Sequence, residues 1–229
     1  MISNLYFCIL SAFYSLMLLI ICKRKTNYTL KHHIFKLLVL TNFIGIIIGF
    51  ACFYTVLNYQ ILPMTNYIVS RLYLVYLLIW IILFTLYIFT ISYNFDFKNK
   101  NYIKVKKVMM ILFIIFTILI FILPLNYVNT GSKVYSYGPS AKMIYALSEA
   151  LTLIGILSMF KNAKKIDVKK YSPLFIFIAG GVLVMLIQSV YPELLLITSM
   201  EVFVTYMIYF SMENGFNKKA VQKLEEEKK

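Results

Sequence analysis

Charged residues are scarce in this 229-residue chain. They make up 14% of it and apolar residues 61%, whereas a soluble domain averages about 25% charged and about 45–50% apolar residues. The composition therefore excludes an ordinary soluble domain and indicates a membrane protein. Acidic residues are the scarcer of the charged residues: the chain has 9 Asp and Glu and 23 Lys and Arg. The basic residues cluster between apolar runs, where they set membrane topology, so we expect no nucleic-acid partner.

Sequence motifs of catalysis are also missing. The chain contains no GxxxxGK[ST], HExxH, CxxC or GxSxG, so we expect the chain as given to be no enzyme and to hold no cofactor. Its two histidines, His32 and His33, have no further ligand at a workable spacing, and we expect no metal site. Cys8, Cys22 and Cys52 lie within or beside apolar runs, which predicts membrane-packed thiols rather than disulfides.

Long apolar runs dominate what is present. A helix that crosses a bilayer needs about 20 mostly apolar residues, and that length identifies seven segments. The sequence therefore predicts an all-α polytopic membrane protein with a bundle of seven transmembrane helices over residues 1–213. The predicted spans are 4–22, 34–57, 70–93, 108–125, 140–160, 172–190 and 193–212.

The basic residues predict the orientation of this bundle. Of the 23 Lys and Arg residues, 20 fall in alternate connections and the C-terminal tail, and 3 fall on the opposite side. Basic residues are retained in the cytoplasm, which places the N-terminus outside and the C-terminus inside. Among the outer connections, 126–140 has the turn residues of a loop, namely Gly131, Gly138 and Pro139.

Two acidic residues lie inside predicted spans. Glu149 stands about nine residues into the fifth span and Glu201 about eight into the seventh, so both carboxylates lie about 12–14 Å below the outer boundary. A charge at that depth costs at least about 2.5–3.5 kcal/mol, so each should face the bundle interior. Helical spacing places Thr198 and Thr205 on the face of Glu201. It likewise places Lys142, Tyr145 and Thr152 on the face of Glu149.

Three further residues are candidates to join these two polar faces, namely Gln188 of the sixth span, Asn42 of the second and Arg71 of the third. Arg71, at the outer start of the third span, is a candidate partner for Glu193 or for an anionic ligand. We therefore predict a ligand-binding or proton-sensing site comprising Glu149, Glu201, Tyr145, Gln188, Arg71 and Thr198. Structural pairing between helices is the alternative.

Aromatic and glycine spacings carry weaker signals. Tyr73, Tyr76, Trp80 and Tyr87 are spaced as one helical face, which favours interface anchoring and core packing over a cofactor site. The "GIIIG" at 45–49 predicts a close helix contact within the bundle.

Two stretches resemble a known family. "YPELLLITSMEVFVTYMIYFSMEN" (191–214), preceded by Gln188, resembles the end of the seven-transmembrane N-terminal region of bacterial sensor histidine kinases, where the last helix ends in "YFxxEN". "YSYGPSAKMIYALSEAL" (135–151) resembles the outer loop and fifth helix of that region. The family's "ENPD" reads "ENGF" here, and nothing up to residue 229 resembles a phosphoacceptor helix or an ATP-binding domain.

The resemblance implies a sensory module in the bacterial cytoplasmic membrane. Residues 214–229 are rich in charged helix formers and are predicted to begin a signalling helix that pairs in a homodimer, with a kinase or cyclase beyond residue 229. The signal would be a small ligand or a proton bound on the outer half. A small proton-coupled solute transporter and a structural membrane subunit remain as alternatives.

Overall fold

The chain folds into a mostly helical bundle. The computed structural model describes residues 2–23, 29–131, 133–162, 180–184, 186–188, 190–191 and 196–210. Their principal elements are α1 (Ile2–Lys23), α2 (Leu30–Leu57), α3 (Pro63–Tyr93), α4 (Lys100–Ile122), β1 (Asn126–Asn129), β2 (Val134–Tyr137) and α5 (Pro139–Lys161). One more helix, Leu196–Phe210, ends the described part of the chain and is called the last described helix below.

Four of the described helices, α2 to α5, are long and apolar enough to cross a membrane. They contain most of the predicted spans 34–57, 70–93, 108–125 and 140–160, so the membrane character of the chain is confirmed to that extent. The shorter last described helix and the helix α1 coincide with the predicted spans 193–212 and 4–22. Most of the predicted span 172–190 and all of the extension 214–229 lie outside the described residues.

Several helices begin well before their apolar runs, because polar or proline residues start them. Thr29 accepts a hydrogen bond from the backbone N–H of His32 at the start of α2 (3.4 Å), and Asn99 caps α4 in the same way (2.9 Å). Pro63 occupies the first turn of α3, where its missing N–H costs nothing. The lengths of the helices therefore exceed the predicted spans 34–57, 70–93 and 108–125.

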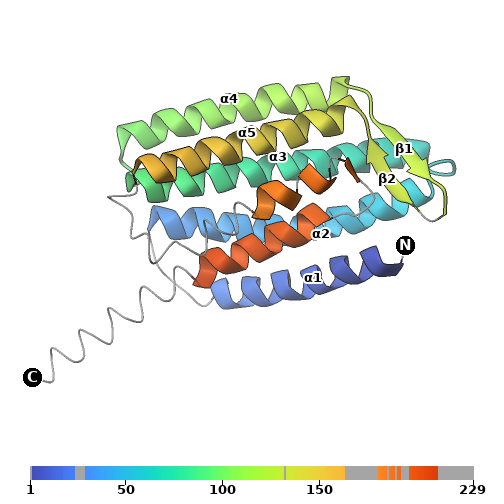
Figure 1. Ribbon diagram of the computed structural model, residues 1–229, viewed down its shortest axis with the longest axis horizontal. Helices are drawn as coiled ribbons and strands as arrows, with labels where there is room; N and C mark the ends of the chain where they lie inside the picture. The colour runs from blue at the N-terminus through green and yellow to red at the C-terminus, as the bar shows by residue number, and fades with distance from the viewer. Residues whose placement is uncertain are drawn as a thin grey trace, which may run out of the picture.

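The helix α3 lies at the centre of the bundle, and α4 lies at its edge (Figure 1). In the most apolar stretch of α3, 78% of the residues are buried inside the protein, against 11% in α4. Most of the apolar surface of α4 is therefore exposed, as expected of a helix that faces lipid. Residues of α3 can therefore reach α2, α5 and the last described helix.

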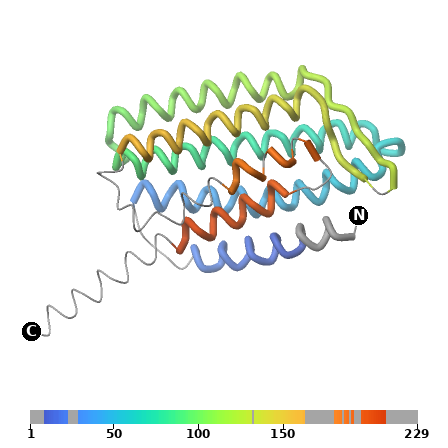
Figure 2. The backbone as a smooth tube through the Cα atoms, in the orientation of Figure 1, coloured from blue at the N-terminus to red at the C-terminus, as the bar shows by residue number. Residues whose placement is uncertain are grey.

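The first and the last described helices run side by side along another edge of the bundle (Figure 2). Ser11 of α1 donates a hydrogen bond to the Ser199 hydroxyl (3.0 Å), and the Tyr206 hydroxyl donates to the Tyr14 carbonyl (2.8 Å). Polar contacts of this kind join helices that have no hydrophobic driving force for association within lipid.

A β-hairpin closes one end of the bundle (Figure 1). The strands β1 and β2 pair antiparallel, with Asn126 opposite Tyr137, in the segment that the sequence predicts as a loop. Gly138 follows β2 with a φ of 131°, and a Cβ there would lie 3.0 Å from the Pro124 carbonyl oxygen, so glycine suits the tight passage into α5. The loop prediction is thus corrected to a short hairpin.

Candidate functional site

Glu201 lies on the buried face of the last described helix. It is 6% exposed, and Thr198 and Thr205, on the same face, are buried with it. The spacing of these residues, three and four apart, puts them above one another on a helix. The prediction that Glu201 shares a buried face with the two threonines is confirmed.

A tyrosine from α3 is the hydrogen-bond partner of this carboxylate. The Tyr76 hydroxyl donates to Oε2 of Glu201, and both side chains are buried. A hydrogen bond to a carboxylate is stronger than one between neutral groups, and in an apolar bundle it offsets part of the cost of burying the acid. The sequence predicts Glu149, Gln188 or a bound polar group as the neighbour of Glu201, whereas the hydrogen-bonded partner in the structure is Tyr76.

Further hydrogen bonds hold the last described helix against α2 and α3. The Tyr73 hydroxyl and the Thr198 hydroxyl lie 2.9 Å apart. Asn42 of α2 donates to the Thr205 hydroxyl (2.6 Å), which in turn donates to the Glu201 carbonyl (2.7 Å). Every polar side chain on the buried face of this helix therefore meets a polar group on a neighbouring helix.

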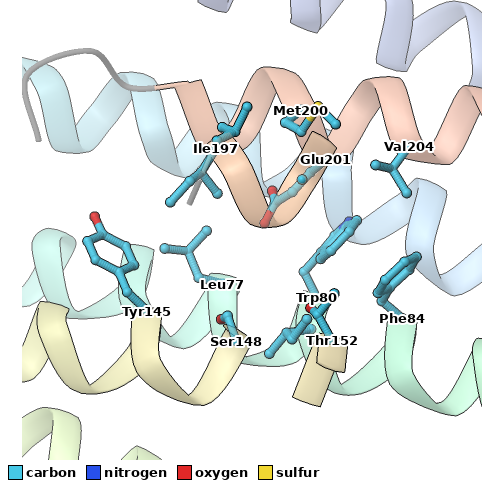
Figure 3. Close-up of a pocket in the computed structure, with 13 residues that line it drawn as sticks. Leu77, Trp80, Phe84, Tyr145, Ser148, Thr152, Ile197, Met200, Glu201 and Val204 are labelled. Atoms are coloured by element: carbon cyan, nitrogen blue, oxygen red, sulfur yellow. The ribbon is translucent and has the colours of Figure 1, made fainter. Parts of the chain in front are cut away.

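A small cavity of about 50 Å³ lies between α3, α5 and the last described helix (Figure 3). Figure 3 shows the Glu201 carboxylate pointing into this space, toward the α3 and α5 ribbons. The polar side chains at the cavity come from Glu201 and from α5, and the rest of the lining is apolar or aromatic. The lining residues are Leu77, Trp80, Ile81, Phe84, Tyr145, Ser148, Thr152, Gly181, Val184, Ile197, Met200, Glu201 and Val204.

This cavity can accept a small polar guest. A void of this size has room for water or a small polar group, and a water needs about two to four polar partners to be held there. Glu201 offers its second carboxylate oxygen, and Ser148 and Thr152 offer hydroxyl groups. The arrangement therefore places one carboxylate at an otherwise largely apolar void inside the bundle.

Gln188 holds the beginning of the last described helix. Its side-chain oxygen accepts a hydrogen bond from the backbone N–H of Ile197 (2.8 Å), and the side chain is 2% exposed. The first backbone N–H groups of a helix have no partner within the helix, so a buried acceptor at this place stabilises its start. Tyr145 of α5 interacts with the same glutamine side chain. Gln188 thus joins α5 to the helix that carries Glu201.

The face of α5 at the cavity differs from the predicted one. Tyr145 and Thr152 line the cavity as predicted, but Ser148 stands between them. Glu149 is only half-buried and is not among the described residues of the lining, and Lys142 is exposed. Ser148 and Glu149 lie about 100° apart on either side of the direction of Tyr145 and Thr152, and the cavity lies on the Ser148 side.

Arg71 lies apart from the cavity. It precedes Tyr76 by five residues on α3, which corresponds to about 7.5 Å along the helix axis toward the hairpin. Its Nη2 donates to the Leu123 carbonyl beyond the end of α4 (3.2 Å). Glu193, its predicted partner, lies outside the described residues. Of the predicted site residues, Glu201 and Tyr145 line the cavity. Gln188 and Thr198 bind the last described helix beside it, Glu149 is not in the described lining, and Arg71 lies toward the hairpin.

The sequence interpretation missed Tyr73 and Tyr76 as partners of polar groups. Their spacing was compatible with packing and with anchoring, and both tyrosines do pack in the core. The sequence shows that Tyr73 and Tyr76 share a helical face, but only the structure shows that this face meets the glycines of "GIIIG" on α2.

Comparison with known proteins adds no assignment. No protein-family model matches this chain, and a search of curated proteins finds no match. The resemblance to the membrane region of sensor histidine kinases therefore depends on the quoted stretches alone. Among the described residues, no cluster of three or more His, Cys, Asp or Glu side chains is arranged to hold a metal ion.

Proposed function

We propose that this chain is the membrane-embedded sensory module of a bacterial signal-transduction protein of the sensor histidine kinase type. The observation that carries the proposal is Glu201, a buried carboxylate that meets Tyr76 on one side and a cavity on the other. Ionisable groups at such depth are costly, and in membrane proteins they mark ligand or proton sites by default. The signal would be a small polar ligand or a proton.

The last described helix would transmit the signal. It is held to α3 through Tyr76 and Tyr73 and to α2 through Asn42. A ligand or proton that competes for the Glu201 carboxylate changes the free energy of the Tyr76 hydrogen bond, and so favours a second position of the helix. Movement would continue into residues 214–229, which we propose pair in a homodimer and lead to an output domain.

The proposed module has seven spans in the cytoplasmic membrane, with the hairpin outside. The charge distribution at the two ends of the described bundle supports this orientation. The hairpin end carries Arg71, Lys133 and Lys142. The opposite end carries Lys31, Lys36, Lys98, Lys100, Lys104, Lys106, Lys107 and Lys161, as expected of the cytoplasmic side.

The chain provides its own reporter for a test. Trp80 is the single tryptophan, and it lines the cavity together with Glu201 (Figure 3). We would titrate its fluorescence with protons in lipid nanodiscs, since the proton is the one candidate signal that needs no identification. We expect the emission to change with pH in the unmodified protein and in Glu149→Gln, and the change to be lost in Glu201→Gln.

A second measurement links the site to the helix. Spin labels at two exposed positions, Tyr93 of α3 and Phe210 of the last described helix, would report the distance between these helices during the same titration. A distance that changes with the Trp80 signal supports transmission. An emission change that persists in Glu201→Gln, or a distance that stays constant while the emission changes, contradicts the proposal.

Transport is the competing function that the same cavity favours. A transporter in sealed vesicles must change the amount of solute inside, whereas a sensor need not. Solute uptake driven by a pH gradient, and abolished by Glu201→Gln but not by Glu149→Gln, would replace the sensor by a proton-coupled transporter.

A further inference from the structure

Arg71 is a buried cation whose hydrogen-bonding capacity is mostly unused. Its side chain is 4% exposed, and the guanidinium carbon lies 3.7 Å from the centre of the Tyr67 ring. Its Nη2 donates to Leu123, but Nε and Nη1 are buried without a hydrogen-bond partner in the described part of the chain. Stacking on Tyr67 contributes a cation–π attraction but satisfies neither nitrogen.

Two other spare polar groups are connected to this region, Tyr127 directly beside Arg71 and Asn66 through Ser70, and both can donate. The Tyr127 hydroxyl of β1 lies close enough to Arg71 and Ser70 to interact with both, although neither contact reaches hydrogen-bonding geometry. Burial raises the pKa of the Tyr127 hydroxyl, and the nearby Arg71 charge opposes that shift. Ser70 donates to Oδ1 of Asn66 (3.1 Å). The buried Nδ2 of the same side chain has no hydrogen-bond partner among the described residues.

No described carboxylate balances the Arg71 charge. Asp96 lies at the opposite end of the bundle, Glu201 meets Tyr76, and no ion pair to Glu149 or any other described acid is found for Arg71. Burying one ion without a partner costs several kcal/mol, and spare buried N–H groups add to that cost. An acceptor that carries negative charge removes both penalties at once.

We propose that Arg71, together with Tyr127 and Asn66, forms a binding site for a phosphate-type oxyanion beneath the hairpin. The site is separate from the Glu201 cavity and does not depend on the proposed sensory function. Because Arg71 lies where the apolar run of α3 begins, about 12 Å along the helix axis from Pro63, its depth matches the region of lipid headgroups. The anion is therefore either a phospholipid headgroup or a free phosphate group. A two-stranded hairpin has little stability of its own, so it can yield to admit the anion.

The test compares these two sources of phosphate on the purified full chain in uncharged detergent. Thermal unfolding is followed against inorganic phosphate, with sodium chloride at matched ionic strength, and against phosphatidylglycerol, with diacylglycerol as the lipid that lacks phosphate. A ligand that binds only the folded protein raises the unfolding midpoint with its concentration. We expect a saturable rise with at least one phosphate source, in the unmodified protein and in Lys142→Gln, which removes an exposed cation at the same end.

In Arg71→Gln the apparent affinity should fall by about 30-fold or more, as for truncation of one partner of a buried charge pair. A rise with inorganic phosphate identifies a free anion, and a rise with phosphatidylglycerol alone identifies a headgroup. No rise with either source, or an equal rise in Arg71→Gln, overturns the proposal.

Two variants keep the test decisive if Arg71→Gln does not fold. Arg71→Lys retains the charge but loses the planar donors, and Tyr127→Phe loses only a hydroxyl, so both should weaken the anion effect. An unchanged affinity in both would overturn the site. Glu193→Gln tests whether the Glu193 carboxylate pairs with Arg71. If the anion effect is absent from the unmodified protein and appears only in Glu193→Gln, that carboxylate neutralises Arg71 and the proposal is wrong.

Discussion

Gly45 of α2 lies directly beneath the ring of Tyr76 of α3, and a Cβ at Gly45 would overlap that ring. The missing side chain allows the tyrosine to cross the surface of α2 and reach Glu201 on the last described helix. Small residues at helix contacts serve this purpose widely in membranes, where backbones must approach closely. A glycine in α2 thereby makes room for a hydrogen bond between α3 and the last described helix.

Replacement of this glycine should disturb both packing and the hydrogen bond. We expect Gly45→Ala to destabilise the bundle by about 1–3 kcal/mol, because a buried ring must move to make room for the methyl group. The measurement is unfolding by sodium dodecyl sulfate in mixed micelles. The Trp80 emission should also change, since Tyr76 withdraws from Glu201 and alters the cavity that Trp80 lines.

Gly49 gives the matched control. It belongs to the same "GIIIG", but a Cβ there would lie 3.5 Å from the Tyr73 ring, which is an ordinary contact distance. Since alanine favours a helix over glycine by about 0.5–1 kcal/mol, Gly49→Ala should be neutral or stabilising. Equal destabilisation by both substitutions would mean that the Tyr76 contact is not what makes Gly45 special.

The bond between Tyr76 and Glu201 should appear as a coupling energy. Tyr76→Phe leaves the carboxylate without its described donor and should cost about 1–3 kcal/mol. Glu201→Leu leaves the hydroxyl unpaired at a similar cost, and the double variant should cost less than the two single variants together. Glu201→Gln keeps an acceptor for Tyr76 and should be the mildest change. Additive costs would show that the two side chains do not interact.

Cysteine labelling can determine the sidedness of the membrane. In a background without Cys8, Cys22 and Cys52, Thr130→Cys in the hairpin turn should react with an impermeant thiol reagent added outside the cell. Asn101→Cys, at the opposite end, should react only after the membrane is opened; both positions are exposed to solvent or lipid headgroups rather than buried. Labelling with the reverse pattern would invert the orientation.

The pattern of apolar and polar residues was sufficient to predict the buried face of the last described helix. Helical periodicity and the cost of a charge in lipid together place Glu201, Thr198 and Thr205 inward, and the structure agrees. These are local properties of one helix. The same reasoning was less accurate on α5, where Ser148 and Glu149 are adjacent and a difference of one position rotates the face by about 100°.

Partners across helices were not predictable in the same way. Tyr76 lies 125 positions from Glu201, and nothing local to either residue distinguishes a hydrogen-bonding tyrosine from one that only packs. The strands of the hairpin are also short, and turn residues alone do not separate a paired loop from an open one. The unused hydrogen-bond donors of Arg71 were not predictable either, because they result from the burial of its side chain in the assembled bundle.

The contact between α1 and the last described helix constrains how the chain is made. Ser11 meets Ser199 across 188 positions, and Tyr206 meets Tyr14 across 192. A ribosome delivers α1 to the membrane well before the Leu196–Phe210 segment. Until that segment is made, α1 must wait beside α2 with Ser11 facing lipid or a helper protein. The bundle can close only after the Leu196–Phe210 segment has entered the membrane, so a nascent chain arrested before Leu196 should leave α1 accessible to partners that the finished protein excludes.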